Sequence, residues 1–67
     1  MRISYNKLWK MLIDKDMNKH ALAEKSGVSS ASIAKLSKGA NITTDILLKI
    51  CTALDCRIED IMETIKD

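Results

Sequence analysis

The chain contains no proline and no phenylalanine, and it has only two glycines among its 67 residues. Apolar residues make up 46% of it and charged residues 30%, a balance typical of globular proteins and not of disordered ones. Its length suits one domain, covering residues 1–67. With so few residues that break helices, we expect a compact all-α bundle.

Long apolar runs are also missing. None reaches the roughly 18 residues that a membrane-spanning helix needs, and no signal-peptide pattern precedes the first helical segment. The sequence therefore predicts a soluble, cytoplasmic protein that does not bind a membrane.

Residues that commonly hold metals or perform catalysis are scarce. The two cysteines, Cys51 and Cys56, are five positions apart, and the single histidine, His20, is far from both. This spacing fits neither a zinc site nor a Cys-x-x-Cys redox pair, so we expect two reduced thiols that pack as small apolar side chains. No Ser/His/Asp set and no phosphate-binding glycine loop is present either. The sequence predicts no enzyme, no cofactor, no metal and no small-molecule ligand.

Charge is distributed unevenly along the chain. Residues 1–41 contain eight basic and three acidic side chains, a net charge of +5, whereas residues 42–67 contain three basic and six acidic ones, a net charge of −3. No acidic residue lies between Lys25 and Asp45. A basic N-terminal part favours an anionic partner on that side of the protein.

Five segments have the apolar spacing of amphipathic helices. The first helix is expected over about residues 4–15, with Tyr5, Leu8, Trp9, Leu12 and Ile13 inward. The fourth is expected within residues 42–55, with Thr43 or Thr44 as its cap. The fifth is expected over residues 57–66, with Ile58, Ile61, Met62 and Ile65 inward. The only strand candidate is residues 2–4, which could pair with the same segment of a second chain.

The second and third helices are separated by a short turn. Asn18 is a suitable N-cap for the second helix, and Gly27 can end it in a left-handed conformation. Ser29 is a suitable cap for the third helix, which Gly39 ends. Two steeply crossing helices need a small residue where their backbones approach, which Ala23 provides. Large aliphatic residues must then pack beneath the pair, and these are Leu22, Val28, Ile33 and Leu36. This spacing over about residues 18–38 predicts a helix-turn-helix.

The outward face of the third helix carries only small and basic side chains. With 100° per residue, Ile33 and Leu36 define the buried side. The opposite side gathers Ser30, Ala31, Ala34, Lys35 and Lys38. Such a face allows close approach to a polyanion, because the lysines reach outward and the serine hydroxyls can bond phosphates or base edges.

From about residue 8 to residue 65 the sequence resembles the Cro/CI-type (phage-repressor-like, XRE) helix-turn-helix family. The core "LAEKSGVSSASIAKLSKG" and the tail "ALDCRIEDI" carry the resemblance. It implies a five-helix, lambda-repressor-like DNA-binding domain, encoded by a bacterium or a phage. The third helix, about residues 29–38, would enter the major groove.

The resemblance also assigns roles to individual residues. Base contacts are expected from Ser30, Ala31, Ser32 and Lys35, and phosphate contacts from Asn18, Lys19, Ser29, Lys38 and Asn41. Many relatives carry glutamine or arginine where this chain has Ser30 and Ala31. Serine bonds several base edges and alanine contacts only the thymine methyl, so we expect modest direct readout of sequence.

The expected function is that of a small transcriptional regulator, a repressor, that binds double-stranded DNA as a homodimer. The alternative is a protein-interaction module on the same scaffold, such as an antitoxin-like partner or a modulator of a larger regulator. A protein interface would place aromatic or large apolar anchors on the third helix. The small, basic face of that helix favours DNA.

Overall fold

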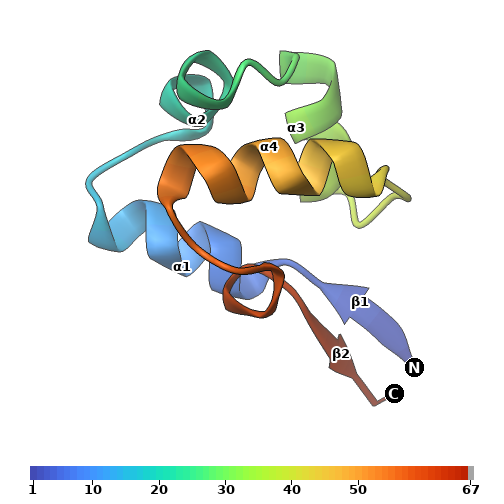
Figure 1. Cartoon of the computed structure of the whole chain (residues 1–67). Helices are drawn as coiled ribbons and strands as arrows, with labels where there is room; N and C mark the ends of the chain where they lie inside the picture. The colour runs from blue at the N-terminus through green and yellow to red at the C-terminus, as the bar shows by residue number, and fades with distance from the viewer. Residues whose placement is uncertain (67) are drawn as a thin grey trace.

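The structure is a computed structural model that describes residues 1–66. Four α-helices, one 3₁₀ turn and two short strands follow one another in this part of the chain (Figure 1). They are β1 (Arg2–Ser4), α1 (Asn6–Asp14), α2 (Lys19–Ser26), α3 (Ser30–Ser37), α4 (Thr44–Leu54), η1 (Ile58–Asp60) and β2 (Glu63–Ile65). The expectation of a mostly helical fold is confirmed, but the expectation of five α-helices is wrong.

Local capping explains where three of the helices begin. The side chain of Asn18 accepts a hydrogen bond from the backbone nitrogen of Ala21 at 2.7 Å, at the start of α2. Ser29 caps α3 in the same way, accepting from the nitrogen of Ser32 at 3.2 Å. Thr43 caps α4. Each cap pairs a backbone donor that the first turn of a helix leaves without an intrahelical acceptor.

α4 crosses the middle of the fold, with α2 and α3 on one side of it and α1 and the strands on the other (Figure 1). Its residues Leu47, Ile50 and Leu54 are buried with the central residues of the other helices. Leu8, Leu22 and Leu36, from α1, α2 and α3, are all fully buried. This shared core fixes α2 and α3 relative to the rest of the chain.

The C-terminal segment differs most from expectation. Residues 57–66 form a single 3₁₀ turn and then strand β2, not a fifth helix. The carboxylate of Asp60 accepts a hydrogen bond from the backbone nitrogen of Arg57 at 2.9 Å and so closes the turn tightly. Ile61, just after it, is fully buried and anchors the segment. The β-branched residues that follow suit a strand.

Strand β2 pairs antiparallel with β1 of the same chain, so that Ile3 lies opposite Thr64. The sequence had identified residues 2–4 as a strand candidate, but the observed partner is the other end of the chain and not a second copy. The two termini therefore lie close together, as Figure 1 shows. Ser4, whose hydroxyl accepts a hydrogen bond from the nitrogen of Asn6, makes the transition from β1 into α1. The first helix is accordingly shorter than its predicted range of 4–15.

Gly27 ends α2 with a φ of +75°, as its position predicted. A Cβ atom built there would contact nothing within 4 Å, so any penalty for a side chain comes from the backbone alone. We expect Gly27→Val to destabilise the fold by about 2 kcal/mol, because β-branched residues resist positive φ. For a domain of this size that lowers the melting temperature by about 10 °C. Gly27→Asn should lower it much less, since asparagine tolerates this conformation. Equal melting temperatures for Gly27→Val and the native protein would contradict the left-handed conformation at residue 27.

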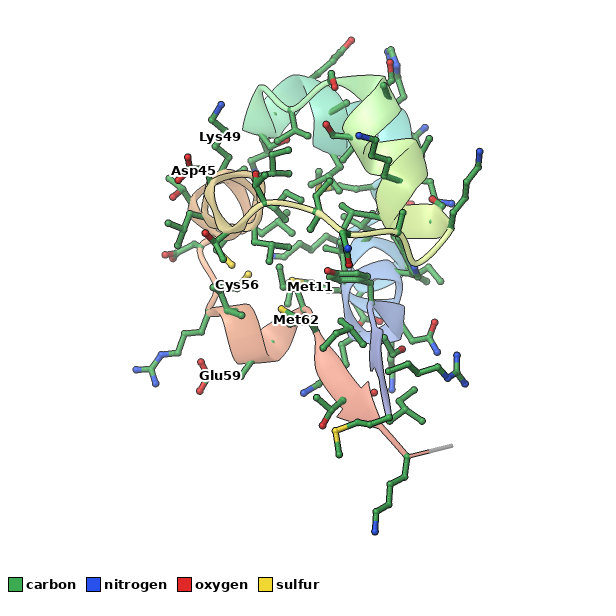
Figure 2. The ribbon with its side chains drawn as sticks, turned by 90° about the vertical axis from the view of Figure 1, so that its right-hand side faces the viewer. Met11, Asp45, Lys49, Cys56, Glu59 and Met62 are labelled. Atoms are coloured by element: carbon green, nitrogen blue, oxygen red, sulfur yellow. The ribbon has the colours of Figure 1, made fainter. Side chains whose placement is uncertain are left out.

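Both cysteines are free thiols, and Cys51 is buried, as expected. Cys56 is half-buried and points with Met11 and Met62 into the space between α1, the end of α4 and the C-terminal segment (Figure 2). Burial, reinforced by the neighbouring Cys51 thiol and by Asp60, raises the pKa of Cys56 from 9.0 to about 11.

This raised pKa has two measurable consequences. At pH 8, Cys56 holds about a hundredfold less thiolate than it would at a pKa of 9.0, so alkylation by iodoacetamide should be correspondingly slower in the folded protein than in urea. The folded state also binds the proton more tightly than the unfolded state. Its stability should therefore fall as the pH rises from about 9 to about 11. Equal alkylation rates in the folded and unfolded chain would contradict the burial of this thiol.

Candidate nucleic-acid interface

The start of α2 and the outer face of α3 meet on one side of the molecule. Between them lies a groove of about 410 Å³, which we call the α2–α3 groove. Its walls include Lys19 and His20 from α2, and Ser30, Ala34 and Lys38 from α3 and its C-terminal end. The structure thus brings together residues from both ends of the predicted helix-turn-helix.

The helix wheel drawn from the sequence describes α3 well. Ile33 and Leu36 are buried, whereas Ser30, Ala31, Ala34, Lys35 and Lys38 are exposed. The exposed side therefore carries no side chain longer than serine apart from its two lysines. Because these side chains are short, the backbone of α3 can come close to the floor of a groove about 12 Å wide, the width of the major groove of B-DNA.

Two of the predicted contact residues also act within the protein. The Ser29 hydroxyl accepts from the nitrogen of Ser32 and lies 3.1 Å from the Ser32 hydroxyl, with which it is hydrogen-bonded. Ser32 is half-buried. Ser29 and Ser32 therefore stabilise the first turn of α3. Ser30 and Ala31 lie in this turn, so the same hydrogen bonds fix their positions.

Asn18 and Asn41 occupy different surroundings. Asn18 uses its side-chain oxygen as the cap of α2, next to Lys19. Asn41 is exposed in the loop between α3 and α4 and does not line the α2–α3 groove. The structure brings Asn18 to the α2 end of the predicted interface and leaves Asn41 at its periphery.

Ser26 stabilises the turn between α2 and α3 through its hydroxyl group. Its hydroxyl donates to the carbonyl oxygen of Leu22 at 2.6 Å and accepts from the nitrogen of Val28 at 3.3 Å. One hydroxyl thus bonds both sides of the turn at Gly27. It holds together the last turn of α2 and the chain leading into α3.

Lys19 lies close to α1 as well as to α3. Its ammonium nitrogen is 4.8 Å from the centroid of the Trp9 ring, within the range of a cation–π interaction. The sequence favoured a core role for Trp9, and the residue is indeed half-buried against the core. Its second role, as a support for Lys19, depends on the packing of α1 against α2 and was not apparent from the spacing.

His20 forms an exposed pair with Glu24, one turn along α2, with 2.9 Å between the histidine Nε2 and the carboxylate. This pair is an ion pair only when the imidazole is protonated. With the imidazole charged or neutral, His20 remains the partner of Glu24, which is the one acidic side chain of α2. Lys19 makes no ion pair with the other residues in the described part of the chain, so its ammonium group is available to an outside anion.

Comparison with known proteins now identifies this arrangement. The family model described as "Cro/C1-type HTH DNA-binding domain" matches residues 7–67. The chain belongs to the Cro/C1-type helix-turn-helix family. The resemblance drawn from the sequence is confirmed, with the correction that this member has four α-helices and a small sheet.

A solved structure has nearly the same fold. It is the crystal structure of the transcriptional regulator VanUg, Form II, with a TM-score of 0.91 and 50% sequence identity, covering 98% of this chain and 88% of that one. No curated protein sequence matches the chain significantly. At this coverage, the likeness extends over almost the whole length of both chains.

Within residues 1–66, no three histidine, cysteine, aspartate or glutamate side chains are grouped so that they could hold a metal ion. No helix in this range has both the length and the apolar character needed to cross a bilayer. The α2–α3 side of this Cro/C1-type domain is a positively charged surface of lysines, short side chains and hydroxyl groups.

Proposed function

We propose that this Cro/C1-type chain is a transcriptional regulator that acts as a repressor by binding double-stranded DNA. The observation that carries the proposal is the α2–α3 groove, in which Lys19 and Lys38 flank the exposed side of α3. Phosphates of one DNA strand can meet Lys19 while α3 lies in the adjacent major groove. The family match and the regulator with the same fold support this assignment.

Within this proposal, the residues divide into two groups. Ser30, Ala31 and Lys35 contact base edges, with Ser32 beside them, and Lys38 and Lys19 contact phosphates together with Asn18, Ser29 and Asn41. Phosphate contacts set affinity and base contacts set specificity. Because the base-facing residues are small, we propose that this protein derives much of its affinity from phosphates and its specificity partly from DNA shape.

We propose further that the whole chain acts as one domain and that two copies bind two half-sites. An eight-residue α3 can reach only a few base pairs, and one small module buries a limited area. Two modules related by a dyad double the number of contacts and read a symmetric site.

Selection of bound fragments from a random pool of duplex DNA tests the proposal directly. We expect a two-fold symmetric motif whose half-sites are centred about 34 Å apart, one turn of B-DNA. Measured on the selected site, the affinity should fall steeply and linearly on a plot of log K against log salt. A flat salt response, or no binding at low salt, would support the protein-interaction alternative.

A further inference from the structure

A second groove lies next to the predicted DNA-binding surface, between α1 and the start of α2. This α1–α2 groove has a volume of about 540 Å³, within the range of small-molecule sites in proteins. Its walls are Trp9, Leu12 and Ile13 from α1, Met17 from the turn, and Lys19 and His20 from α2. The sequence alone predicted no small-molecule ligand.

The floor of the groove is apolar, and one part of it has no packing partner. Ile13 was expected to face the core, but it is 76% exposed. It projects on the side where the half-buried Trp9 and Met17 pack against the core. A gathering of large apolar side chains at the surface is costly in water unless something covers it, and such patches commonly mark binding sites.

One end of the groove is positively charged. Lys19 is held over the Trp9 ring, so its ammonium stands at the edge of the apolar floor. The nearest acidic side chain on α2, Glu24, is paired with His20. The groove therefore combines a strip of apolar surface with a single cation at its end.

We propose that the α1–α2 groove binds a small amphipathic anion, a medium-chain carboxylate, with its alkyl chain on Trp9, Leu12 and Ile13 and its carboxylate at Lys19. This occupant complements both the apolar floor and the charge. DNA complements only the charged end, because phosphates gain nothing from Ile13. A protein partner would need roughly 800 Å² on each side, and the few residues of α1, the turn and the start of α2 that line this groove offer far less.

Binding there has a consequence that rests on the proposed function. Lys19 and His20 line both the α1–α2 groove and the α2–α3 groove. A carboxylate bound to Lys19 neutralises a cation that the DNA would otherwise use. The ligand and the DNA are therefore in competition, and the ligand releases the regulator from its site.

The lone tryptophan provides the measurement, since Trp9 lies in the groove itself. Titration of the protein with decanoate, below its micelle concentration, should change the fluorescence of Trp9 saturably, with a Kd of about 1 mM or lower. Octanoate should bind about tenfold more weakly, because two methylene groups are lost from the apolar contact. Decanol, which has no charge, should bind more weakly than decanoate.

Two variants with a matched control make the test specific. Ile13→Asn should weaken decanoate binding at least about tenfold, since it replaces the exposed apolar wall. Leu48→Asn makes a similar change at an exposed leucine of α4, outside the groove, and should leave binding unchanged. Lys19→Met should remove the preference for decanoate over decanol. No saturable signal, or equal binding by the native protein and Ile13→Asn, would overturn the proposed site.

The link to DNA is measured separately on the selected DNA site. Saturating decanoate should weaken DNA binding about fivefold or more in the native protein and have little effect in Ile13→Asn. If decanoate binds but leaves the DNA affinity unchanged, the competition is refuted and the site stands. If the protein binds no DNA at all, the proposed function fails while the decanoate titration still decides the ligand site.

Discussion

Replacing Lys35 and Lys38 by glutamate is expected to weaken the binding of duplex DNA by at least about a hundredfold at moderate salt. Both lysines are exposed on the side of α3 that faces away from the core. Each substitution removes a cation from the DNA surface and adds a negative charge that the phosphates repel. The effect should be largest at low salt, where electrostatic attraction contributes most to the affinity.

Folding should be unaffected by the same substitutions. Lys35 and Lys38 make no ion pair within residues 1–66, so their reversal breaks no internal ion pair. Far-UV circular dichroism of the double variant should match that of the native protein. Retained DNA binding in a folded double variant would refute the assignment of α3 as the recognition helix.

A matched control separates local contact from total charge. Lys49→Glu with Lys66→Glu changes the net charge by the same amount. Lys49 projects from the outer side of α4, opposite to α3, as Figure 2 shows. Lys66 is exposed next to β2. This control should weaken binding only slightly, through the long-range field of the protein. Equal losses in the two double variants would mean that net charge, and not the α3 surface, determines affinity.

The helix-turn-helix was predictable because its signals are local. Asn18 and Ser29 cap their helices through hydrogen bonds to residues three positions later, and Gly27 meets a backbone requirement at its own position. Such interactions depend on neighbours in the sequence, so the residue types reveal them directly. The outward side of α3 follows from the same periodicity, and so do the candidate base contacts Ser30, Ala31 and Lys35.

The features that were missed depend on contacts between distant parts of the chain. Ile58, Ile61, Met62 and Ile65 have helical spacing, yet the segment becomes a turn and a strand because β1, some sixty residues earlier, supplies its partner. Ile13 belongs by spacing to the inner face of α1, but it is exposed, whereas the adjacent Leu12 is buried in the core. The α1–α2 groove exists only because the turn after α1 brings Lys19 back to Trp9. Periodicity describes one element and carries no information on what packs against it.

The reassigned C-terminal segment leads to the largest expected change in stability. Ile61 is fully buried, whereas Ile58, Met62 and Ile65 are only half-buried. Replacing Ile61 by alanine removes buried methyl and methylene groups and leaves a cavity, which typically costs about 2–5 kcal/mol. In a domain of this size the melting temperature should fall by about 10–20 °C. Ile13→Ala is the matched control and should change it by no more than about 2 °C, because Ile13 is already exposed to water.

If the C-terminal segment were instead the amphipathic helix that its spacing suggests, Ile58→Ala and Ile65→Ala would lower the stability as much as Ile61→Ala. A melting temperature for Ile61→Ala close to that of the native protein would show that the C-terminal segment does not belong to the core.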